Sequence, residues 1–198
     1  MLKIRIGVKK EVFFGFKSHV MSKIKLYIAT SIDGYIARKN NSLDWLYALE
    51  NPNNIDHDYG AFLSGIDAVV LGRNTYEEIM SFGVEWPYAD CDTYILTSSS
   101  EFKIQTPRTS LLNILDINAV VQLKAKSKKD IWIVGGGRLI SGFLDLEAID
   151  EMTITIIPTL LGEGIPLFPN NPKETRFELI NAESFETGAV NLNYKRRG

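Results

Sequence analysis

The chain has 198 residues, of which 45% are hydrophobic and 23% are charged, and its formal net charge is −2. This composition is typical of a folded, soluble domain and excludes a disordered or low-complexity chain. The weak negative charge argues against a nucleic-acid binder, and no apolar run approaches the roughly 18 residues that span a membrane.

Residues 1–20 differ in composition from the rest of the chain. They include five basic residues (Lys3, Arg5, Lys9, Lys10 and Lys17) but a single acid, Glu11, and their apolar stretch at residues 12–16 is too short for a signal-peptide core. From Met21 onward, the sequence is typical of a cytosolic start that leads into a strand. We therefore predict an N-terminal extension outside the fold at residues 1–20 and one domain at residues 21–198. A basic arm that touches a membrane surface is the alternative for the extension.

In the first part of the domain, apolar segments typical of strands buried on both faces alternate with segments of helical character. The predicted strands lie at residues 25–31, 35–37, 68–71, 93–96 and 131–134. The predicted helices lie at residues 43–49, 56–63, 75–80, 117–126 and 138–144.

The C-terminal part of the chain has a different pattern. Its predicted elements are a strand, a loop rich in Gly and Pro, and two further strands, at residues 152–157, 158–169, 177–185 and 190–194. A turn at Thr187-Gly188 joins the last two strands. In the final strand, Val190, Leu192 and Tyr194 alternate with polar residues, which predicts one solvated face and an antiparallel partner. We therefore predict a three-layer α/β fold whose central mixed sheet is mostly parallel and ends in an antiparallel hairpin.

Cysteine and histidine are scarce in this chain. Cys91 is the only cysteine, which excludes an intramolecular disulfide and favours a reducing, cytoplasmic location. Thiolate zinc sites need several cysteines, so we predict no metal site. His19 and His57 are the two histidines, and neither lies in a motif typical of a catalytic triad. An enzyme of this composition is expected to take its reactive group from a bound cofactor.

The first strand-to-helix corner has the features of an anion site. The strand at residues 68–71 ends at Gly72, and Asn74 and Thr75 are the expected capping residues of the next helix. Backbone N–H groups and the dipole at a helix N-terminus attract anions, and Arg73 adds donors that suit a phosphate. A capped helix with a solvated arginine explains this corner alone equally well.

The second corner is a run of three glycines. Gly135, Gly136 and Gly137 directly follow a predicted strand, and Arg138 and Leu139 open the next helix. Glycines carry an entropic cost, but they let the backbone approach a ligand such as a pyrophosphate closely. Their spacing is not that of the dinucleotide-binding fingerprint. A tight packing turn is the alternative.

Hydroxyl groups follow a third buried strand, at Thr97 and Ser98. Ligands of open α/β sheets bind outside the carboxyl ends of the strands. Together with the two corners, these hydroxyls predict a polyphosphate ligand along that edge of the sheet.

The order of these motifs resembles that of the dihydrofolate reductase fold. The motifs are Ala29 with Asp33, Gly72-Arg73-x-Thr75, Leu96-Thr97-Ser98 and Gly135-Gly136-Gly137-Arg138. More specifically, the chain is similar to the reductase domain that forms the C-terminal half of the bifunctional riboflavin-biosynthesis deaminase–reductase. The stretch at residues 149–168, with its Leu161-Gly162-x-Gly164 motif, is typical of small stand-alone relatives of that domain. The likeness covers about residues 23–196.

The resemblance implies a reductase that uses NADPH. The implied contacts are Ala29 and Ile36 at the nicotinamide; Gly72, Arg73 and Thr75 at the pyrophosphate and the adenosine phosphate; Thr97 and Ser98 near the 2′-phosphate; and Gly135, Gly136, Gly137, Arg138 and Leu139 along the pyrophosphate and the nicotinamide ribose. Arg73 and the hydroxyls favour NADPH over NADH, because only NADPH carries a 2′-phosphate.

The implied substrate is a small heterocycle, as in 5-amino-6-(5-phosphoribosylamino)uracil reductase of riboflavin biosynthesis. Asp33 is the candidate catalytic residue, with a turn aspartate that bonds its own backbone as the alternative. Ser31, Trp45 and Tyr59 are candidate substrate contacts, although such aromatic residues more often lie in a core.

Two other functions remain open at this point. A dihydrofolate or pterin reductase is one, although no acid in the segment before the first corner stands out as the steering acid of those enzymes. A non-catalytic NADPH-binding sensor or scaffold is the other, because a fold does not guarantee an activity. The resemblance also suggests a homodimer, since related domains often pair.

Overall fold

The structure, a computed structural model, describes residues 21–169 and 172–197. The extension predicted at residues 1–20 lies outside the described residues. The described residues fold around one large sheet.

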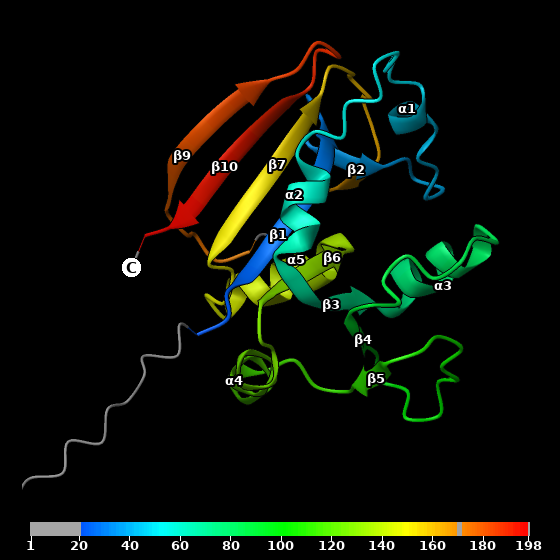
Figure 1. The fold of residues 1–198 in the computed structure, drawn as a ribbon, viewed down its shortest axis with the longest axis vertical. Coiled ribbons are helices and arrows are strands. Elements are labelled where there is room, and N and C mark those ends of the chain that lie inside the picture. Colours follow the sequence, from blue (N-terminus) through cyan, green and yellow to red (C-terminus); the bar gives the residue numbers. More distant parts are fainter. Residues whose placement is uncertain (1–20, 170–171, 198) are drawn as a thin grey trace, which may run out of the picture.

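An eight-stranded sheet forms the centre of the molecule (Figure 1). Its strands are β1 (Ile24–Ser31), β3 (Ile66–Gly72), β4 (Asp92–Leu96), β5 (Thr109–Leu112), β6 (Asp130–Gly135), β7 (Glu151–Ile157), β9 (Phe177–Ser184) and β10 (Val190–Arg196). They lie in the order β5-β4-β3-β6-β1-β7-β10-β9. All neighbours pair in parallel except β10, which is antiparallel to β7 and to β9. The predicted mixed sheet with its C-terminal antiparallel hairpin is confirmed.

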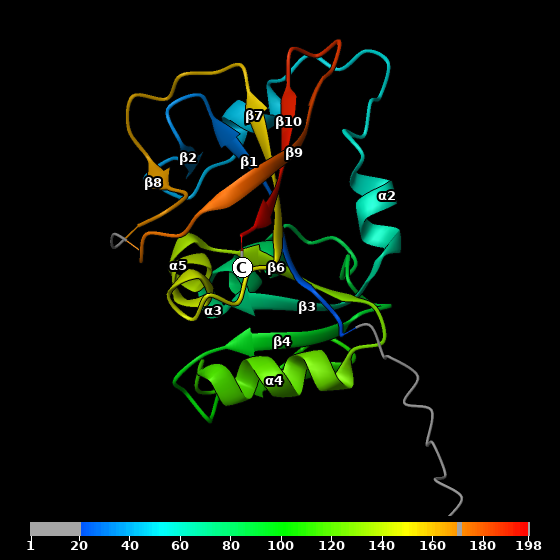
Figure 2. The same cartoon turned by 90° about the vertical axis from the view of Figure 1, so that its left-hand side faces the viewer.

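Helices cover both faces of the sheet. On one side, called here the α5 face, α4 (Ile117–Lys126) and α5 (Gly137–Asp145) pack on a core that includes Ile24, Leu26 and Val70. On the other side, the α2 face, α2 (Tyr59–Ser64) and α3 (Arg73–Ser81) pack near Val69 and Trp132. Figure 2 shows α5 and α2 on opposite sides of the sheet. The predicted three layers are therefore present.

Burial on both faces explains the apolar runs of the parallel strands. Val69, Val70 and Leu71 of β3 are fully buried, because successive side chains point to opposite faces and both faces are covered. Near the carboxyl ends of β1 and β7, a third cluster contains Trp45 of the short helix α1 (Asp44–Tyr47) and Ala189.

Two short strands were not predicted as separate elements. β5 lies at one edge of the sheet and, among the described strands, pairs only with β4; half of its residues, Thr109 and Ser110, are polar, so it lacks an apolar run. β8 (Ile165–Pro166) lies inside the predicted Gly- and Pro-rich loop, where it pairs with β2 (Tyr35–Ala37).

Candidate functional site

The carboxyl ends of β4, β3, β6 and β1 lie side by side, because these four strands are parallel neighbours in the sheet. This edge is called here the carboxyl edge. It carries, in spatial order, Thr97 after β4, Gly72 at the end of β3, Gly135 at the end of β6 and Ser31 at the end of β1. The segments that the sequence analysis assigned to cofactor binding are thus adjacent in space.

The two glycine corners touch each other. A Cβ atom built on Gly72 would lie 3.8 Å from the carbonyl oxygen of Gly135 and 3.9 Å from the nitrogen of Gly136. A Cβ atom on Gly136 would lie 3.4 Å from Oγ1 of Thr75. The two predicted anion sites therefore form one cradle of backbone, called here the glycine cradle (Gly72, Gly135 and Gly136), in which Gly72 and Gly136 are partly exposed and Gly135 is buried.

Helices α3 and α5 both begin at this cradle without a side-chain cap. Gly72 is the N-cap of α3 and Gly136 is the N-cap of α5, and no side chain of the described residues caps the first N–H groups of either helix. Helix α4 differs, since its N-cap Asp116 accepts a hydrogen bond from the backbone N–H of Ala119 at 2.7 Å. The first turns of α3 and α5 thus keep N–H donors for a ligand.

The prediction that Asn74 and Thr75 cap α3 was wrong. The helix begins at Arg73, one residue after the strand ends, so both residues lie within its first turn. Gly72 takes the cap position in an extended conformation, with φ −73° and ψ 153°.

The reason why glycine is suited to its position differs among the three consecutive glycines. Gly135 has φ +132°, which favours glycine, and apart from its two chain neighbours no described residue has an atom within 4 Å of the position of its missing Cβ. A Cβ atom on Gly137 would lie only 2.8 Å from Cδ of Pro169 and 2.9 Å from the carbonyl oxygen of Pro166. Gly137 thus fits the packing-turn alternative, whereas Gly135 leaves open space beside the backbone.

Arg73 lies at the start of α3 with its side chain half exposed. Its Nε donates a hydrogen bond to Oε1 of Glu77 at 2.9 Å. Its guanidinium stands 5.0 Å from the centre of the Phe102 ring, within the range of a cation–π contact. These contacts orient the guanidinium and leave it accessible beside the cradle.

The other predicted cofactor contacts differ in whether their polar groups are accessible to a ligand. Ser98 and Arg138 are exposed at the carboxyl edge. Thr97 is buried, and its hydroxyl accepts a hydrogen bond from the N–H of Ser99 at 3.2 Å. Leu139 is buried in the core, and its N–H donates to the carbonyl of Gly136 at 2.9 Å, so it offers a ligand neither its side chain nor its N–H.

Asp33 joins two loops beside the carboxyl edge. Its Oδ1 accepts hydrogen bonds from the hydroxyl of Ser31 at 2.6 Å and from the N–H of Leu161 at 3.1 Å, and its Oδ2 accepts from the N–H of Gly162 at 2.7 Å. The Ser31 hydrogen bond, with the two N–H groups, holds the pKa of Asp33 below its ordinary value. The carboxylate therefore stays ionised and fastens the loop after β7 to the loop after β1.

The apolar candidates lie within hydrophobic clusters. Ala29 packs near Trp45, which is 3% exposed, and Ile36 packs against the core of the α5 face. The Tyr59 ring lies 5.8 Å from the rings of Tyr27 and Trp132, centre to centre. These contacts favour the core interpretation of Trp45 and Tyr59.

A buried polar network on the α2 face escaped the sequence analysis. The amide of Asn191 donates to the carbonyl of His57 at 2.7 Å, as does the hydroxyl of Tyr27 at 2.6 Å. Thr155 donates to Oδ1 of Asn191 at 2.6 Å. Asn191 is 1% exposed, so the prediction of a solvated face for the final strand was wrong at this position. The segment around His57 covers it.

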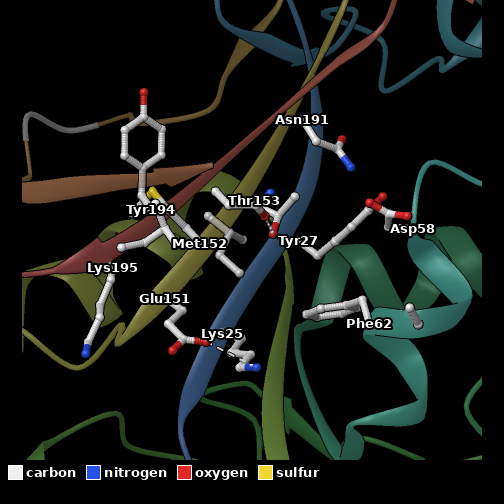
Figure 3. A pocket seen from close by; sticks show the side chains of 14 residues that line it. Lys25, Tyr27, Asp58, Phe62, Glu151, Met152, Thr153, Asn191, Tyr194 and Lys195 are labelled. Atoms are coloured by element: carbon white, nitrogen blue, oxygen red, sulfur yellow. Dashed lines mark hydrogen bonds and ion pairs between the residues drawn. The ribbon is translucent and has the colours of Figure 1, made fainter. Parts of the chain in front are cut away.

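A groove of about 580 Å³ lies on the α2 face, lined by residues of β1, β7, β9 and β10 and by the start of α2 (Figure 3). Lys25 and Glu151, at the beginnings of β1 and β7, belong to its lining. The groove is thus at the opposite end of these strands from the carboxyl edge.

Neither a membrane-spanning helix nor a metal-binding cluster is present among the described residues. Within these residues, no helix is both long and apolar enough to cross a bilayer. No three His, Cys, Asp or Glu side chains of the same residues are grouped in a way that could hold a metal ion.

Comparison with known proteins gives consistent matches. Residues 22–191 match the family described as the RibD C-terminal domain. The uncharacterised protein YwjB of Bacillus subtilis (strain 168) is 38% identical over 174 residues, which are 88% of this chain and 98% of that protein.

Solved structures with the same fold include reductases. A protein of Shewanella sp. PV-4 that is attributed to riboflavin biosynthesis superposes with a TM-score of 0.81 and 34% identity, over 89% of this chain and 99% of that one. Dihydrofolate reductase from Enterococcus faecalis, in complex with NADP(H), superposes with a TM-score of 0.62 and 18% identity, over 89% and 97% of the two chains. At that identity, the second likeness shows the fold alone.

Proposed function

The chain belongs to the RibD C-terminal domain family, and we propose that it is a reductase that transfers a hydride from NADPH to a small heterocyclic substrate. The observation that carries this proposal is the glycine cradle, where two uncapped helix N-termini meet beside Arg73. Backbone N–H groups at helix N-termini bind phosphates, and a guanidinium binds them with paired donors.

The residues of the carboxyl edge fit a dinucleotide phosphate. The space beside the missing Cβ of Gly135 and the partly exposed backbone of Gly72 and Gly136 would let a ligand approach, and the first N–H groups of α3 and α5 would face an anion there. NADPH, when bound, supplies the hydride. Arg73 and the exposed hydroxyl of Ser98 would hold the additional 2′-phosphate, which selects NADPH over NADH. Ala29 and Ile36 would border the nicotinamide.

Asp33 would contribute by positioning rather than by donating a proton. An ionised carboxylate that accepts three hydrogen bonds is a poor acid, but it holds the loops after β1 and β7 in one arrangement. A fixed pocket mouth keeps the donor and the acceptor at reacting distance, which is a large part of what a hydride-transfer enzyme provides.

We propose a substrate similar to 5-amino-6-(5-phosphoribosylamino)uracil, the substrate of the riboflavin-pathway reductase. The family membership and the likeness to the Shewanella protein support this class. The activity would take place in the cytoplasm, where the single buried thiol of Cys91 stays reduced.

Titration of tryptophan fluorescence with NADPH and with NADH tests the cofactor. We expect saturable binding with a preference for NADPH, and an absence of binding at millimolar NADPH would refute the proposal. The purified chain is then mixed with NADPH and either the phosphoribosylaminouracil or dihydrofolate. Loss of NADPH absorbance with the first alone supports the riboflavin-type activity, and loss with dihydrofolate alone supports a pterin reductase. NADPH binding without turnover of either compound would favour another heterocycle or a cofactor-binding sensor.

A further inference from the structure

The segment between β4 and β5 brings an aromatic ring to Arg73. Strands β3 and β4 are parallel neighbours, with Gly72 opposite Leu96, so the chain leaves both strands side by side. Arg73 directly follows the first of these two residues. In the segment that follows the second, the half-buried Phe102 has its ring centre 5.0 Å from the guanidinium carbon of Arg73. A cation at this distance from an aromatic face is attracted to it.

Phe102 is itself held by Tyr76 of α3. The two rings meet in a T-shaped contact with their centres 5.8 Å apart, and Tyr76 is 1% exposed. The hydroxyl of Tyr76 accepts a hydrogen bond from the N–H of Gln105 at 3.1 Å and lies 3.1 Å from Oγ1 of Thr106. A buried side chain of α3 thus fixes both the Phe102 ring and the backbone that carries it.

Glu77 provides a second contact to the same guanidinium. Nε of Arg73 donates to Oε1 of Glu77 at 2.9 Å, and the two residues lie about one helical turn apart on α3. A guanidinium binds a phosphate through a pair of N–H groups, and its two Nη nitrogens form such a pair when Nε is bonded elsewhere. With the carboxylate on Nε and the Phe102 ring beside it, the guanidinium has fewer orientations than a solvated arginine.

Orienting the guanidinium in advance favours the binding of its ligand. A side chain that is already ordered loses less conformational entropy when the ligand binds. In the function proposed above, Arg73 holds the 2′-phosphate, which is the one group that distinguishes NADPH from NADH. The affinity for NADPH should therefore depend on what orients Arg73, whereas the affinity for NADH should not. Phe102 can act in this way without any contact to the cofactor.

We propose that Phe102 is a positioning residue that strengthens the preference for NADPH over NADH, because its ring orients Arg73 toward the 2′-phosphate. This inference rests on the proposed function and adds a residue to it. The alternative is a purely structural role, since the Phe102 ring also packs on Tyr76. The two roles have different consequences. Loss of a structural contact affects both cofactors, whereas loss of the orientation of Arg73 affects NADPH alone.

Fluorescence titration with NADPH and with NADH, applied to the full chain and three variants, tests this role. Phe102→Leu keeps an apolar side chain against Tyr76 but removes the ring, and it should weaken NADPH binding by about threefold or more while NADH binding stays unchanged. Phe102→Tyr keeps the ring and should retain the wild-type preference. The matched control is Phe82→Leu, because Phe82 is 45% exposed at the end of α3 that is distant from Arg73. That variant should bind both cofactors like the wild-type protein, and thermal unfolding checks that all three variants fold.

A double variant tests whether the ring acts through Arg73. In an Arg73→Gln protein, Phe102→Leu should cause no further change in the ratio of the two affinities, because the charge that the ring orients is already absent. An unchanged ratio in a folded Phe102→Leu protein would overturn the inference, as would equal losses of both affinities or a loss that persists in the Arg73→Gln protein.

Failure of this inference can be told apart from failure of the proposed function. A wild-type protein without a preference for NADPH would overturn the proposed cofactor together with the role of Phe102. A wild-type protein that prefers NADPH, combined with an unchanged ratio in Phe102→Leu, would overturn the role of Phe102 alone.

Discussion

Gly72 and Gly137 differ in what surrounds them, and replacing each by alanine separates cofactor binding from folding. A methyl group on Gly72 would meet its nearest atoms at 3.8 and 3.9 Å, which is ordinary contact, and the backbone there suits alanine. The free energy of unfolding should change by less than about 1 kcal/mol, with a gain expected from the less flexible unfolded chain. The methyl group would nevertheless occupy the glycine cradle. We expect NADPH to bind at least about tenfold more weakly, a loss of roughly 1.4 kcal/mol.

Gly137→Ala should have the opposite effect. Its methyl group would lie 2.8 Å from Cδ of Pro169 and 2.9 Å from the carbonyl oxygen of Pro166, so α5 and the segment after β8 must move apart. Overpacking of this kind costs about 1–3 kcal/mol, which for a domain of this length lowers the melting temperature by roughly 2–12 °C.

Thermal unfolding and fluorescence titration with NADPH, applied to both variants, provide the two measurements. The expected result is a crossed pattern, with affinity lost in Gly72→Ala and stability lost in Gly137→Ala. Unchanged NADPH affinity in a folded Gly72→Ala protein would refute the assignment of the cradle to the cofactor. An unchanged melting temperature in Gly137→Ala would refute the packing argument.

Three further predictions concern single side chains. Arg73→Gln should weaken NADPH binding by about tenfold or more and leave NADH binding almost unchanged, because only the 2′-phosphate loses a charged partner; titrations with both cofactors measure the ratio. Asp33→Asn should destabilise the protein at neutral pH, because the amide is a weaker acceptor for the N–H groups of Leu161 and Gly162. Because the pKa of Asp33 is lowered in the folded protein, the ionised carboxylate stabilises the fold above the ordinary aspartate pKa, and this stabilisation is lost as the pH falls through the pKa of the folded state. Urea unfolding of the wild-type and Asp33→Asn proteins over that pH range should therefore show the difference between their free energies of unfolding becoming smaller as the pH falls. Burial raises the pKa of the Cys91 thiol, so a thiol reagent should modify it slowly in the native protein and quickly in urea, and fast native labelling would contradict the burial.

Much of the fold could be predicted because burial leaves a clear pattern in the sequence. Helix α4 occupies residues 117–126 as predicted, since its apolar face and its cap at Asp116 are local features. Strand β5 lacked such a signal, because an edge strand with one neighbour needs no continuous apolar run. Asn191 was placed on a solvated face by its alternation with apolar residues, but alternation cannot show that a distant loop covers that face.

In the candidate site too, the local sequence does not show which distant segments contact a residue. The sequence indicates which residues are unusual for their position, such as Asp33 and the glycines, but the cause of each lies in a contact from elsewhere in the chain. Asp33 is fixed by Gly162, and Gly137 is fixed by Pro169. Gly72 faces Gly135 only because β6 returns to lie beside β3, a pairing that local propensity does not determine. Identical residue types within one motif thus have separate causes, so a motif match transfers a function to this chain only where the surroundings of each residue leave room for the ligand. By that criterion, Gly72, Gly135 and Gly136 are suited to the cofactor, while Gly137 and Leu139 serve the fold.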